Sequence, residues 1–414
     1  MEMRPGYKQT EVGVIPEDWK ATTIGDVASF SGGSQPPRHT FKFAPTKGYI
    51  RLIQIRDYKS DAFETYIPDS LAQKRCTAND IMIGRYGPPV FQILRGIDGA
   101  YNVALIKTVP SDRIDRDYLF YVLKQEKLFQ LIDALSRRSS GQTGVEMPAL
   151  KGYGLPLPNP PEQRAIAAAL SDVDALLAKL DQFIAKKCDL KQATMQRLLT
   201  GQTRLPGFSE EWEVKRLGDI GDCLRGVTYK GDSDLSPYDT AHTKRLLRSN
   251  NVQNATVVTT DIQFVNAARV SENQLLRDND ILICMANGSK ALVGKAGLFT
   301  VSDGYKYTFG AFMGCFRSNS VESNATFVFF LFQTGRYRNY INNLLAGSSI
   351  NNLNPSSIES LEFPIPLLPE QTAIATVLSD MDTELAALEA RRDKTRALKQ
   401  GMMQELLTGR IRLV

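Results

Sequence analysis

Short segments of this chain approach the patterns of catalytic and phosphate-binding motifs, but each lacks a residue that the chemistry requires. An Asn-Pro-Pro tripeptide ends at Pro161 and is followed by Glu162, where an amino-methyltransferase needs an aromatic ring to stack on a flipped base. The run from Gly288 to Lys295 is one residue too long for a phosphate loop and is followed by Ala296 instead of Ser or Thr. With two histidines and no C-x-x-C pair, neither a catalytic triad nor a structural zinc site is expected. The sequence therefore predicts a non-catalytic chain that carries no cofactor or metal of its own.

Clusters of Arg, Lys, Asn and Gln are better suited to binding nucleic acid. Arg can bond guanine through two hydrogen bonds, Asn and Gln can do the same with adenine, and basic side chains neutralise phosphates. The candidates in the first half are Arg51, Gln54, Arg56, Arg85, Tyr86, Arg137, Arg138 and Ser139. The candidates in the second half are Lys244, Arg245, Arg248, Asn250, Lys290, Arg336 and Arg338. Any one of them can be ordinary solvated surface, so the prediction rests on their recurrence in both halves.

A block of sequence that occurs twice without a gap, at residues 155–205 and 363–413, must position these clusters. In each copy apolar residues recur at alternating steps of four and three, which is the spacing of a coiled-coil seam. The seam of the first copy is Ile166, Leu170, Val173, Leu177, Leu180 and Ile184. The seam of the second copy is Ile374, Leu378, Met381, Leu385 and Leu388. Arg392 then interrupts the second seam, and its expected continuation is Leu398, Met402 and Leu406.

Both copies carry the start and stop signals of one long helix. Each begins after a proline with a Glu-Gln pair, whose carboxylate favours the positive end of the helix dipole. These pairs are Glu162-Gln163 and Glu370-Gln371, and the helices are expected to end at Gly201 and Gly409. About forty residues between these signals predict a helix roughly 55–60 Å long at ~1.5 Å per residue. We expect the two helices to pair antiparallel as a spacer; an ordinary helical hairpin that serves as a core or a dimer stalk is the alternative.

The remaining sequence of each half forms a globular region with its own similar landmarks. Trp19 and Trp212 open the two regions within related segments. Short apolar strands are expected at residues 79–83 and 279–283, and helices at 117–135 and 325–345. Ser-rich stretches follow these helices, at residues 139–142 and 348–352. Between the landmarks the two regions share little sequence, so a common framework with different surfaces is expected.

These elements predict an α+β fold. It consists of two mixed α/β domains separated by two long helices, which form an antiparallel coiled coil in a pseudo-two-fold tandem repeat. The expected globular domains are residues 1–154 and 206–361, and the expected helical spacers are residues 155–205 and 362–414.

Composition places the chain among ordinary globular proteins. A formal net charge of +5 over 414 residues permits binding to nucleic acid without requiring it. The longest apolar run, Phe327 to Phe332, is far too short to cross a membrane, and the first residues lack the apolar core of a signal peptide. Five isolated cysteines and no export signal indicate a reducing compartment, so a cytoplasmic protein without a membrane partner is expected.

Taken together, these features resemble the specificity (S) subunit of a type I restriction-modification system. The matching residues are Pro161-Glu162-Gln163 with Pro369-Glu370-Gln371, the Leu-Leu-Thr-Gly helix ends, and the Trp-x-x-x-x-x-Gly-Asp segments that begin at Trp19 and Trp212. The order variable, conserved, variable, conserved also matches, so the resemblance spans essentially the whole chain.

The resemblance implies that each globular region is a target recognition domain that reads one half of a bipartite, asymmetric site in double-stranded DNA. It also implies that the paired helices, with their Glu-Gln starts and seam residues, set the spacing and dock two methyltransferase (M) subunits. Restriction (R) subunits would join through these, although the sequence leaves open whether they are present. Methyl transfer from S-adenosylmethionine and ATP-driven cleavage would belong to the partners. The recognised bases and the spacer length are not implied.

Two other functions fit parts of the pattern. The same helices would suit a coiled-coil interaction scaffold that binds no DNA; DNA binding differs from it in weakening steeply with salt. A stand-alone DNA-modifying enzyme is disfavoured by the incomplete motifs, and methylation by the isolated chain would be its signature.

Overall fold

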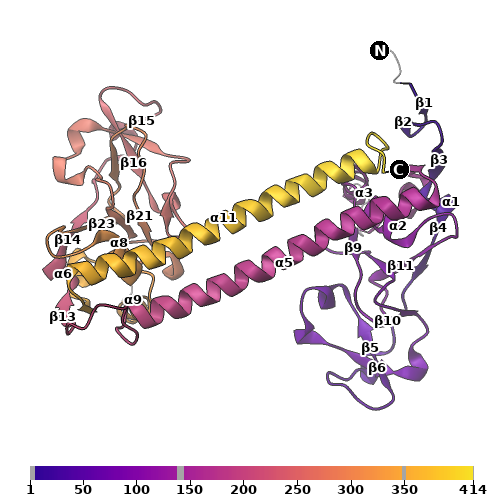
Figure 1. The fold of residues 1–414 in the computed structure, drawn as a ribbon, viewed down its shortest axis with the longest axis horizontal. Coiled ribbons are helices and arrows are strands. Elements are labelled where there is room, and N and C mark those ends of the chain that lie inside the picture. The colour runs from indigo at the N-terminus through magenta and orange to yellow at the C-terminus, as the bar shows by residue number, and fades with distance from the viewer. Residues whose placement is uncertain (1–4, 138–143, 347–350, 414) are drawn as a thin grey trace. The chain divides into compact units, whose positions relative to one another are not determined.

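The computed structural model describes residues 5–137, 144–346 and 351–413, which divide into two compact units (Figure 1). The first unit contains residues 1–181 with 390–414, and the second contains residues 182–389. This division passes through both long helices. Each unit therefore contains a globular domain together with one end of each helix.

The two long helices have the predicted length. Helix α5 spans Pro160–Leu198 and helix α11 spans Leu368–Leu406, each with 39 residues. The expected stop residues follow, since Gly201 and Gly409 adopt φ angles of 70° and 72°, a region that glycine enters without steric cost. The prediction of two matched helices of about forty residues is confirmed.

The globular part of the first unit mixes short strands and helices. Its strands are β1 (Tyr7–Thr10), β2 (Gly13–Pro16), β3 (Lys20–Thr23), β4 (Ala28–Gly32), β5 (Tyr49–Ile53), β6 (Tyr66–Pro68), β7 (Arg75–Cys76), β8 (Ile81–Gly84), β9 (Gln92–Leu94), β10 (Gly99–Tyr101), β11 (Leu105–Pro110) and β12 (Gly154–Leu157). Its helices are α1 (Ile24–Val27), α2 (Arg116–Leu123), α3 (Glu126–Ser136) and α4 (Met147–Gly152). The expected strand at 79–83 is confirmed as β8. The single helix expected at 117–135 is instead two helices, because the chain turns at Lys124 and Gln125.

Strands β1 and β2 pair antiparallel, and three further sheets order the other strands. One has the order β6-β5-β10-β7 and another the order β4-β11-β8-β9. The third pairs β3 with β12 antiparallel, with Lys20 opposite Leu157. Since β12 ends shortly before α5 begins, this pairing fixes the point at which the chain enters the helix.

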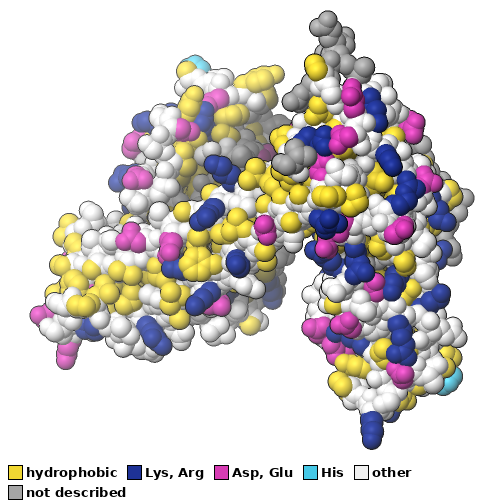
Figure 2. Space-filling view, turned by 45° about the vertical axis from the view of Figure 1, so that its right-hand side comes forward, with side chains coloured by type: hydrophobic (Ala, Val, Ile, Leu, Met, Phe, Trp, Pro, Cys, Tyr) yellow, Lys and Arg dark blue, Asp and Glu magenta, His cyan; other side chains and the backbone are white. Residues whose placement is uncertain are grey.

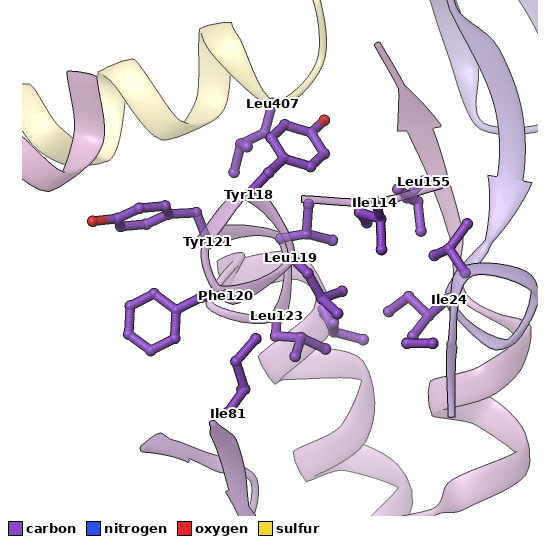
Figure 3. Packing of buried hydrophobic residues seen from close by; sticks show 14 of the residues in the cluster. Ile24, Ile81, Ile114, Tyr118, Leu119, Phe120, Tyr121, Leu123, Leu155 and Leu407 are labelled. Atoms are coloured by element: carbon purple, nitrogen blue, oxygen red, sulfur yellow. The ribbon is translucent and has the colours of Figure 1, made fainter. Parts of the chain in front are cut away.

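The core of the first unit gathers around α2. All residues from Tyr118 to Leu123 are buried. Figure 3 shows Tyr118, Leu119, Phe120, Tyr121 and Leu123 of this run together with Ile24, Ile81, Leu155 and Leu407. Leu407 lies directly after α11, so the end of that helix is part of the core. Each fully buried Leu or Ile contributes roughly 1.5–3 kcal/mol to such a core.

The second unit repeats this plan. Its strands are β13 (Glu213–Arg216), β14 (Gly221–Arg225), β15 (Leu235–Ser236), β16 (Thr243–Leu247), β17 (Val252–Gln253), β18 (Thr256–Val257), β19 (Gln263–Asn266), β20 (Ile281–Cys284), β21 (Ala296–Leu298), β22 (Tyr307–Phe309), β23 (Met313–Ser318) and β24 (Glu362–Ile365). Its helices are α6 (Leu217–Ile220), α7 (Gly231–Asp234), α8 (Ala325–Leu331), α9 (Gly335–Ala346) and α10 (Pro355–Glu359). The strand expected at 279–283 is confirmed as β20, and the helix expected at 325–345 is again two.

Comparison of the sheets shows which part of the framework the two units share. The pair β13–β24 corresponds to β3–β12 and leads into α11, with Glu213 opposite Ile365. The other sheets have the orders β14-β23-β20-β21-β18-β17 and β15-β19-β16-β22. In the core, Phe327 to Leu331 on α8 pack with Leu198 and Leu199 at the end of α5. Each unit thus buries the end of the helix that arrives from the other half of the chain.

Candidate functional site

In the first unit, a buried joint connects the start of α5 to the end of α11. The Glu162 side chain is 2% exposed, and one of its oxygens accepts a hydrogen bond of 3.0 Å from the indole Nε1 of Trp19. Arg412, which follows α11, donates to both carboxylate oxygens at 2.6 and 2.8 Å. The same guanidinium donates to Asp18 at 2.9 and 2.8 Å. These hydrogen bonds hold the pKa of Asp18 below its usual value.

The second unit contains the same joint, formed by the corresponding residues of the repeat. Glu370 is also 2% exposed and accepts a hydrogen bond of 3.0 Å from the indole of Trp212. Arg204, which follows α5, donates to its two oxygens at 2.7 and 2.6 Å. A tryptophan from the domain, a glutamate that begins one helix and an arginine that follows the other therefore meet in both units.

The glutamine next to each glutamate fastens its helix to the domain. Gln163 accepts a 2.6 Å hydrogen bond from the backbone N–H of Asp115, just before α2, and donates 2.9 Å to the carbonyl of Pro158. Gln371 likewise accepts from the N–H of Asn324, just before α8, at 2.9 Å and donates 2.9 Å to Pro366. Both amides are 1% exposed.

Burial changes the role expected for several residues of the repeat. Docking of a partner protein requires an accessible surface, but the two Glu-Gln pairs lie inside their own units. The first seam residues are also core residues, since Ile166, Leu170, Ile374 and Leu378 have no exposed surface. These eight residues (Glu162, Gln163, Glu370, Gln371, Ile166, Leu170, Ile374 and Leu378) attach helices to domains and offer no surface to a partner in this conformation.

The remaining seam residues follow the predicted spacing. Leu180 and Ile184 are buried, and Val173, Leu177, Met381, Leu385 and Leu388 are half-buried. Beyond Leu388 the sequence reading was partly wrong: Leu398 is 60% exposed, whereas Arg392 is half-buried at the position that continues the heptad. Met402 and Leu406 lie on the seam as expected. The heptad is therefore not interrupted at Arg392; polar residues occupy it.

Ion pairs join the two helices inside each unit. In the first unit Lys399 contacts Asp174 at 2.5 Å and Arg396 contacts Asp181 at 3.3 Å. In the second unit Lys187 contacts Glu384 at 2.7 Å, and Lys191 contacts Asp382. Within each unit, later residues of α5 meet earlier residues of α11, so the paired segments run antiparallel.

In the first domain, the predicted DNA-binding residues fall into two groups. Arg51 is engaged by Asp61 and Glu64, at 2.8 Å each, and Gln54 and Arg56 hydrogen-bond with Thr65. Arg85 is exposed and lies over the half-buried Tyr86, and Arg137 is exposed beside Asp133. Arg138 and Ser139 lie outside the described residues. Among the described candidates of this domain, Arg85 and Arg137 are exposed, and Arg56 is exposed as well although it hydrogen-bonds with Thr65.

In the second domain, most candidates are held by neighbours. Arg245 bonds Asp239, Asp303 and the Tyr307 hydroxyl at 2.9, 3.1 and 2.9 Å and lies 3.2 Å from the centre of the Tyr305 ring. Arg248 and Asn250 share Asp261. Arg338 donates to the backbone carbonyls of Val293 and Lys290, and Lys290 to that of Leu345. Lys244 is half-buried on β16, and Arg336 is exposed over the Phe363 ring.

Sequence reasoning missed a basic loop between β4 and β5, at residues 33–48. Arg38, Lys42 and Lys47 are exposed there, and Phe43 beside them is 78% exposed. Basic residues interleaved with an aromatic ring are a pattern that could have found this loop. Elsewhere, Figure 2 shows Lys and Arg side chains interspersed with Asp and Glu over the face that it draws. In the described parts of the chain, no cluster of three or more His, Cys, Asp and Glu could hold a metal, and no helix is long and apolar enough to span a membrane.

Comparison with known proteins links this arrangement to one family. The family model "Type I restriction modification DNA specificity domain" matches the chain twice, at residues 16–186 and 209–396. The specificity subunit of the type I restriction enzyme StySPI from Salmonella potsdam is 33% identical over 48% of this chain, a match that covers 43% of that protein. The putative MjaX specificity subunit from Methanocaldococcus jannaschii is 25% identical over 98% of this chain and 97% of its own length.

A solved structure has the same fold. The S subunit of a type I restriction-modification system from M. genitalium superposes with a TM-score of 0.59 at 14% identity, over 98% of both chains. The two matches to the family model together cover most of the chain, and each includes one globular domain and most of the helix that follows it.

Proposed function

Because the chain belongs to the family of type I restriction-modification DNA specificity domains, we propose that it is the non-catalytic specificity subunit of such a complex. In this proposal residues 1–154 and 206–361 are target recognition domains, and each reads one half of a bipartite site in double-stranded DNA. Methylation and cleavage are carried out by the partner subunits. The incomplete catalytic motifs of this chain agree with that division of labour.

The difference between the two domains supports an asymmetric DNA site. Both domains share the Trp–Glu–Arg joint, but their exposed loops carry different chemistry. The loop of the first domain at residues 33–48 is basic, whereas its counterpart between β14 and β16 carries two glycines, several acidic residues and the 74% exposed Tyr238. Two domains with one framework and different surfaces are suited to reading two different base sequences.

For the spacer, we propose that α5 and α11 form one antiparallel coiled coil along their length. Support comes from the heptad spacing of both seams and from the interhelical ion pairs in both units. A helix pair anchored by a buried joint at each end is stiff, so it can hold two DNA-reading domains at a fixed separation. The repeat would then give the molecule pseudo-two-fold symmetry.

Methyltransferase subunits would dock on the outer faces of the helices, away from the seam. Phe183 and Leu190 lie seven residues apart on α5 and are 43% and 51% exposed, and Leu398 on α11 is 60% exposed. Apolar side chains at heptad spacing on an exposed face are suited to a further helix from a partner. Two M subunits, S-adenosylmethionine bound by them, and R subunits joined through them complete the proposed complex.

The observation that carries the proposal is the duplicated joint, which mounts two different domains in the same way. Its test is exchange of residues 206–361 for the second domain of another family member, followed by sequencing of methylated DNA from cells that also make the M subunit. We expect one half of the methylated site to change and the other half to stay. If neither half changed, the second domain would not be a reader.

Binding of duplex DNA distinguishes the proposed specificity subunit from a coiled-coil scaffold. The assembled complex with its M subunits should bind duplex DNA at low salt, with an affinity that falls steeply as ionic strength rises. A complex that assembles but binds no duplex at low salt would favour the scaffold.

A further inference from the structure

Each domain has an edge at which four segments that are distant in sequence meet. In the first domain these segments follow β5, follow β8, precede β11 and precede α4. In the second domain they follow β16, follow β20, precede β23 and precede α10. We call them the loop edges, and they consist of residues 54–56, 85–87, 102–104 and 144–145 in the first domain and 248–250, 285–287, 310–312 and 352–353 in the second.

In the first domain, backbone hydrogen bonds tie the four segments together. The N–H of Arg85 donates to the carbonyl of Ala104 at 2.8 Å, and the N–H of Val145 donates to the carbonyl of Arg85 at 3.2 Å. The N–H of Asn102 donates to the carbonyl of Ile53, at the end of β5, at 3.1 Å. The side chains of this edge therefore project from a backbone that is fixed from several sides.

The second domain has the same hydrogen bonds at the corresponding positions. The N–H of Met285 donates to the carbonyl of Phe312 at 2.9 Å, and the N–H of Leu353 donates to the carbonyl of Met285 at 2.8 Å. The N–H of Gly310 donates to the carbonyl of Leu247, at the end of β16, at 3.0 Å. The two domains thus share this part of the framework down to single hydrogen bonds.

A glycine beside each loop edge shows how closely the two frameworks match. A Cβ added to Gly33 would lie 1.9 Å from the carbonyl oxygen of Asn102, and one added to Gly226 would lie 2.0 Å from that of Gly310. Any other residue would push the two segments apart, so both positions require glycine. The same close approach of backbone to backbone is therefore built into both domains.

The side chains on this shared framework differ between the domains. Five matched positions of the first loop edge carry Arg56, Arg85, Tyr86, Ala104 and Gly144. The same positions of the second loop edge carry, in the same order, Asn250, Met285, Ala286, Phe312 and Asn352. No residue of either loop edge is acidic, so DNA can approach both edges without repulsion. A common backbone with different side chains is what two readers of different base sequences require.

Arginines distinguish the first loop edge. Arg56 and Arg85 are exposed, and neither forms a salt bridge within the described residues. Arg56 donates to the carbonyl of Phe63 at 3.3 Å and to the Thr65 hydroxyl at 3.4 Å, and Arg85 lies 5.2 Å from the ring centre of Tyr86. These contacts orient the guanidinium groups without neutralising them. A guanidinium can form two hydrogen bonds with O6 and N7 of guanine in the major groove.

Amides and an aromatic ring distinguish the second loop edge. Asn250 and Asn352 are exposed, and Phe312 is 71% exposed. The carbonyl of Phe312 accepts from the N–H groups of Met285 and Ala286 at 2.9 and 3.1 Å, so the ring projects from a fixed turn. An Asn amide can form two hydrogen bonds with N6 and N7 of adenine, and a Phe ring can contact the C5 methyl group of thymine. These side chains are suited to A·T pairs.

We propose that the loop edges are the base-reading surfaces of the two domains. In the major groove, Arg56 and Arg85 read guanine in one half-site. Asn250 and Asn352 read adenine in the other half-site, and the Phe312 ring contacts the C5 methyl group of a thymine there. This inference rests on the proposed function and deepens it, since it names the base chemistry that each domain recognises.

The test uses the complex with its M subunits and duplexes in which single atoms of the recognised site are changed. The site is first read from methylated DNA, and domain exchange assigns one half-site to each domain. 7-Deazaguanine and 7-deazaadenine lack the N7 acceptor, and uracil lacks the methyl group of thymine. The methylated base pair stays unchanged in every duplex. Titration of labelled duplex measures the affinity.

Each substitution should remove the sensitivity to one of these atoms. The wild-type complex should bind roughly tenfold more weakly when a guanine of the first half-site becomes 7-deazaguanine, and Arg85→Ala should lose this sensitivity at one guanine. Uracil in the second half-site should weaken wild-type binding roughly fourfold, the effect of one buried methyl group, and Phe312→Ala should not distinguish it from thymine. Asn352→Ala should likewise lose the sensitivity to 7-deazaadenine at one adenine.

Two matched controls should keep every sensitivity. Arg116→Ala removes an exposed arginine of α2, and Val321→Ala removes an apolar side chain that is 76% exposed; neither residue lies on a loop edge. Phe312→Leu keeps an apolar group and should retain part of the preference for thymine over uracil. Because the substituted side chains are exposed, thermal unfolding of each variant should match that of wild type.

Three results would overturn the inference and leave the proposed function standing. The first is a half-site of the first domain without guanine on either strand. The second is a set of folded variants, Arg85→Ala and Phe312→Ala, that keep the wild-type sensitivities. The third is a uniform loss of affinity with unchanged sensitivities, which would mean that these side chains contact phosphates. A wild-type complex that binds no duplex at low salt would instead refute the proposed function itself.

Discussion

At the scale of single residues, Arg412 makes the contact whose loss should be most damaging. Glu162 is 2% exposed, and Arg412 provides its counter-charge. Arg412→Met would leave that carboxylate buried without a cation, which we expect to lower the free energy of unfolding by about 3 kcal/mol. Urea unfolding of the full chain, followed by tryptophan fluorescence, measures this because Trp19 lies in the joint.

The double variant Arg412→Met with Glu162→Gln is the matched test of that cause. It removes both charges, so it should recover most of the lost stability. Arg204→Met should behave like Arg412→Met, since Arg204 serves Glu370 in the same way. If the double variant were less stable than Arg412→Met, the buried charge would not be the source of the effect.

Asp18 gives the first joint a dependence on pH. Hydrogen bonds from Arg412 lower the pKa of Asp18 in the folded chain, so ionised Asp18 stabilises the fold above its unfolded pKa of about 4. This contribution is lost as pH falls through the lowered pKa. Because Asp18 is half-exposed, Asp18→Asn should cost no more than about 1 kcal/mol at pH 7.

The check is urea unfolding of Asp18→Asn and wild type at several values between pH 7 and pH 3. The difference in unfolding free energy should shrink toward zero below about pH 4. Asp69→Asn, which breaks an exposed pair with Arg75, serves as the comparison. A difference that stayed constant down to pH 3 would show that Asp18 acts through its shape and not through its charge.

Predictions for single residues were correct where the local sequence pattern of a helix determined the position of the residue. The repeated Glu-Gln pairs were correctly placed at the helix starts, but their burial against Trp19 and Trp212 depends on segments far away in sequence. Similarly, nothing near Arg245 in the sequence indicates that Asp303 will pair with it from another loop. Residue type identifies a basic side chain, but only the fold decides whether its charge is already satisfied.

At the scale of elements, the exposed loop 33–48 is expected to bind DNA phosphates. Lys42→Ala with Lys47→Ala should weaken duplex binding by the complex to a similar extent for all sequences. The slope of log affinity against log salt should decrease by about 2 if both lysines contact phosphates. Titration of labelled duplex at several salt concentrations gives both quantities.

Two comparisons make this loop prediction specific. Lys20→Ala with Lys127→Ala removes two exposed lysines from the same domain, on β3 and α3 and outside the loop, and should leave the salt slope unchanged. If the loop variant changed the preferred bases at normal affinity, the loop would read bases and not phosphates.

The long helices were predictable because two independent signals agreed: heptad spacing and matched caps. The break between α2 and α3 at Lys124 and Gln125 could not be predicted, since neither residue is a strong helix breaker. In the second domain the equivalent break precedes Gly335, a clearer signal. The seam beyond Leu388 was misread because only apolar residues were counted, whereas Arg392 and Lys399 keep the heptad positions with their charges paired.

At the scale of the whole molecule, the duplicated framework accounts for how one chain can hold two different domains in equivalent ways. Each domain holds the start of one long helix and the end of the other through the same buried triad, so neither helix has a free end among the described residues. Sequence comparison of the two halves revealed the duplication. It could not reveal that the arginine of each joint comes from the other half of the chain. That arrangement depends on the helices running antiparallel.

If the helices are a ruler, lengthening both should lengthen the DNA site. Residues 175–181 of α5 lie opposite residues 392–398 of α11, as the contact between Asp181 and Arg392 indicates. Duplicating both segments adds one heptad to each helix and keeps the seam and the joints. The pair grows by about 10 Å, so the methylated site should gain about three base pairs between its half-sites.

Sequencing of methylated DNA from cells with the lengthened chain and its M subunit measures the new spacer. The half-sites also turn by roughly 100° around the duplex, since ~10.5 base pairs make one turn, so methylation should be slower than for wild type. Duplicating only residues 175–181 lengthens α5 but not α11, so the two helices no longer match and methylation should be abolished. This control shows whether a new spacer comes from lengthening both helices or from the insertion alone. An unchanged spacer in the chain with both duplications would mean that the helices do not measure the distance between the half-sites, and the separation would then have to be set by the partner subunits.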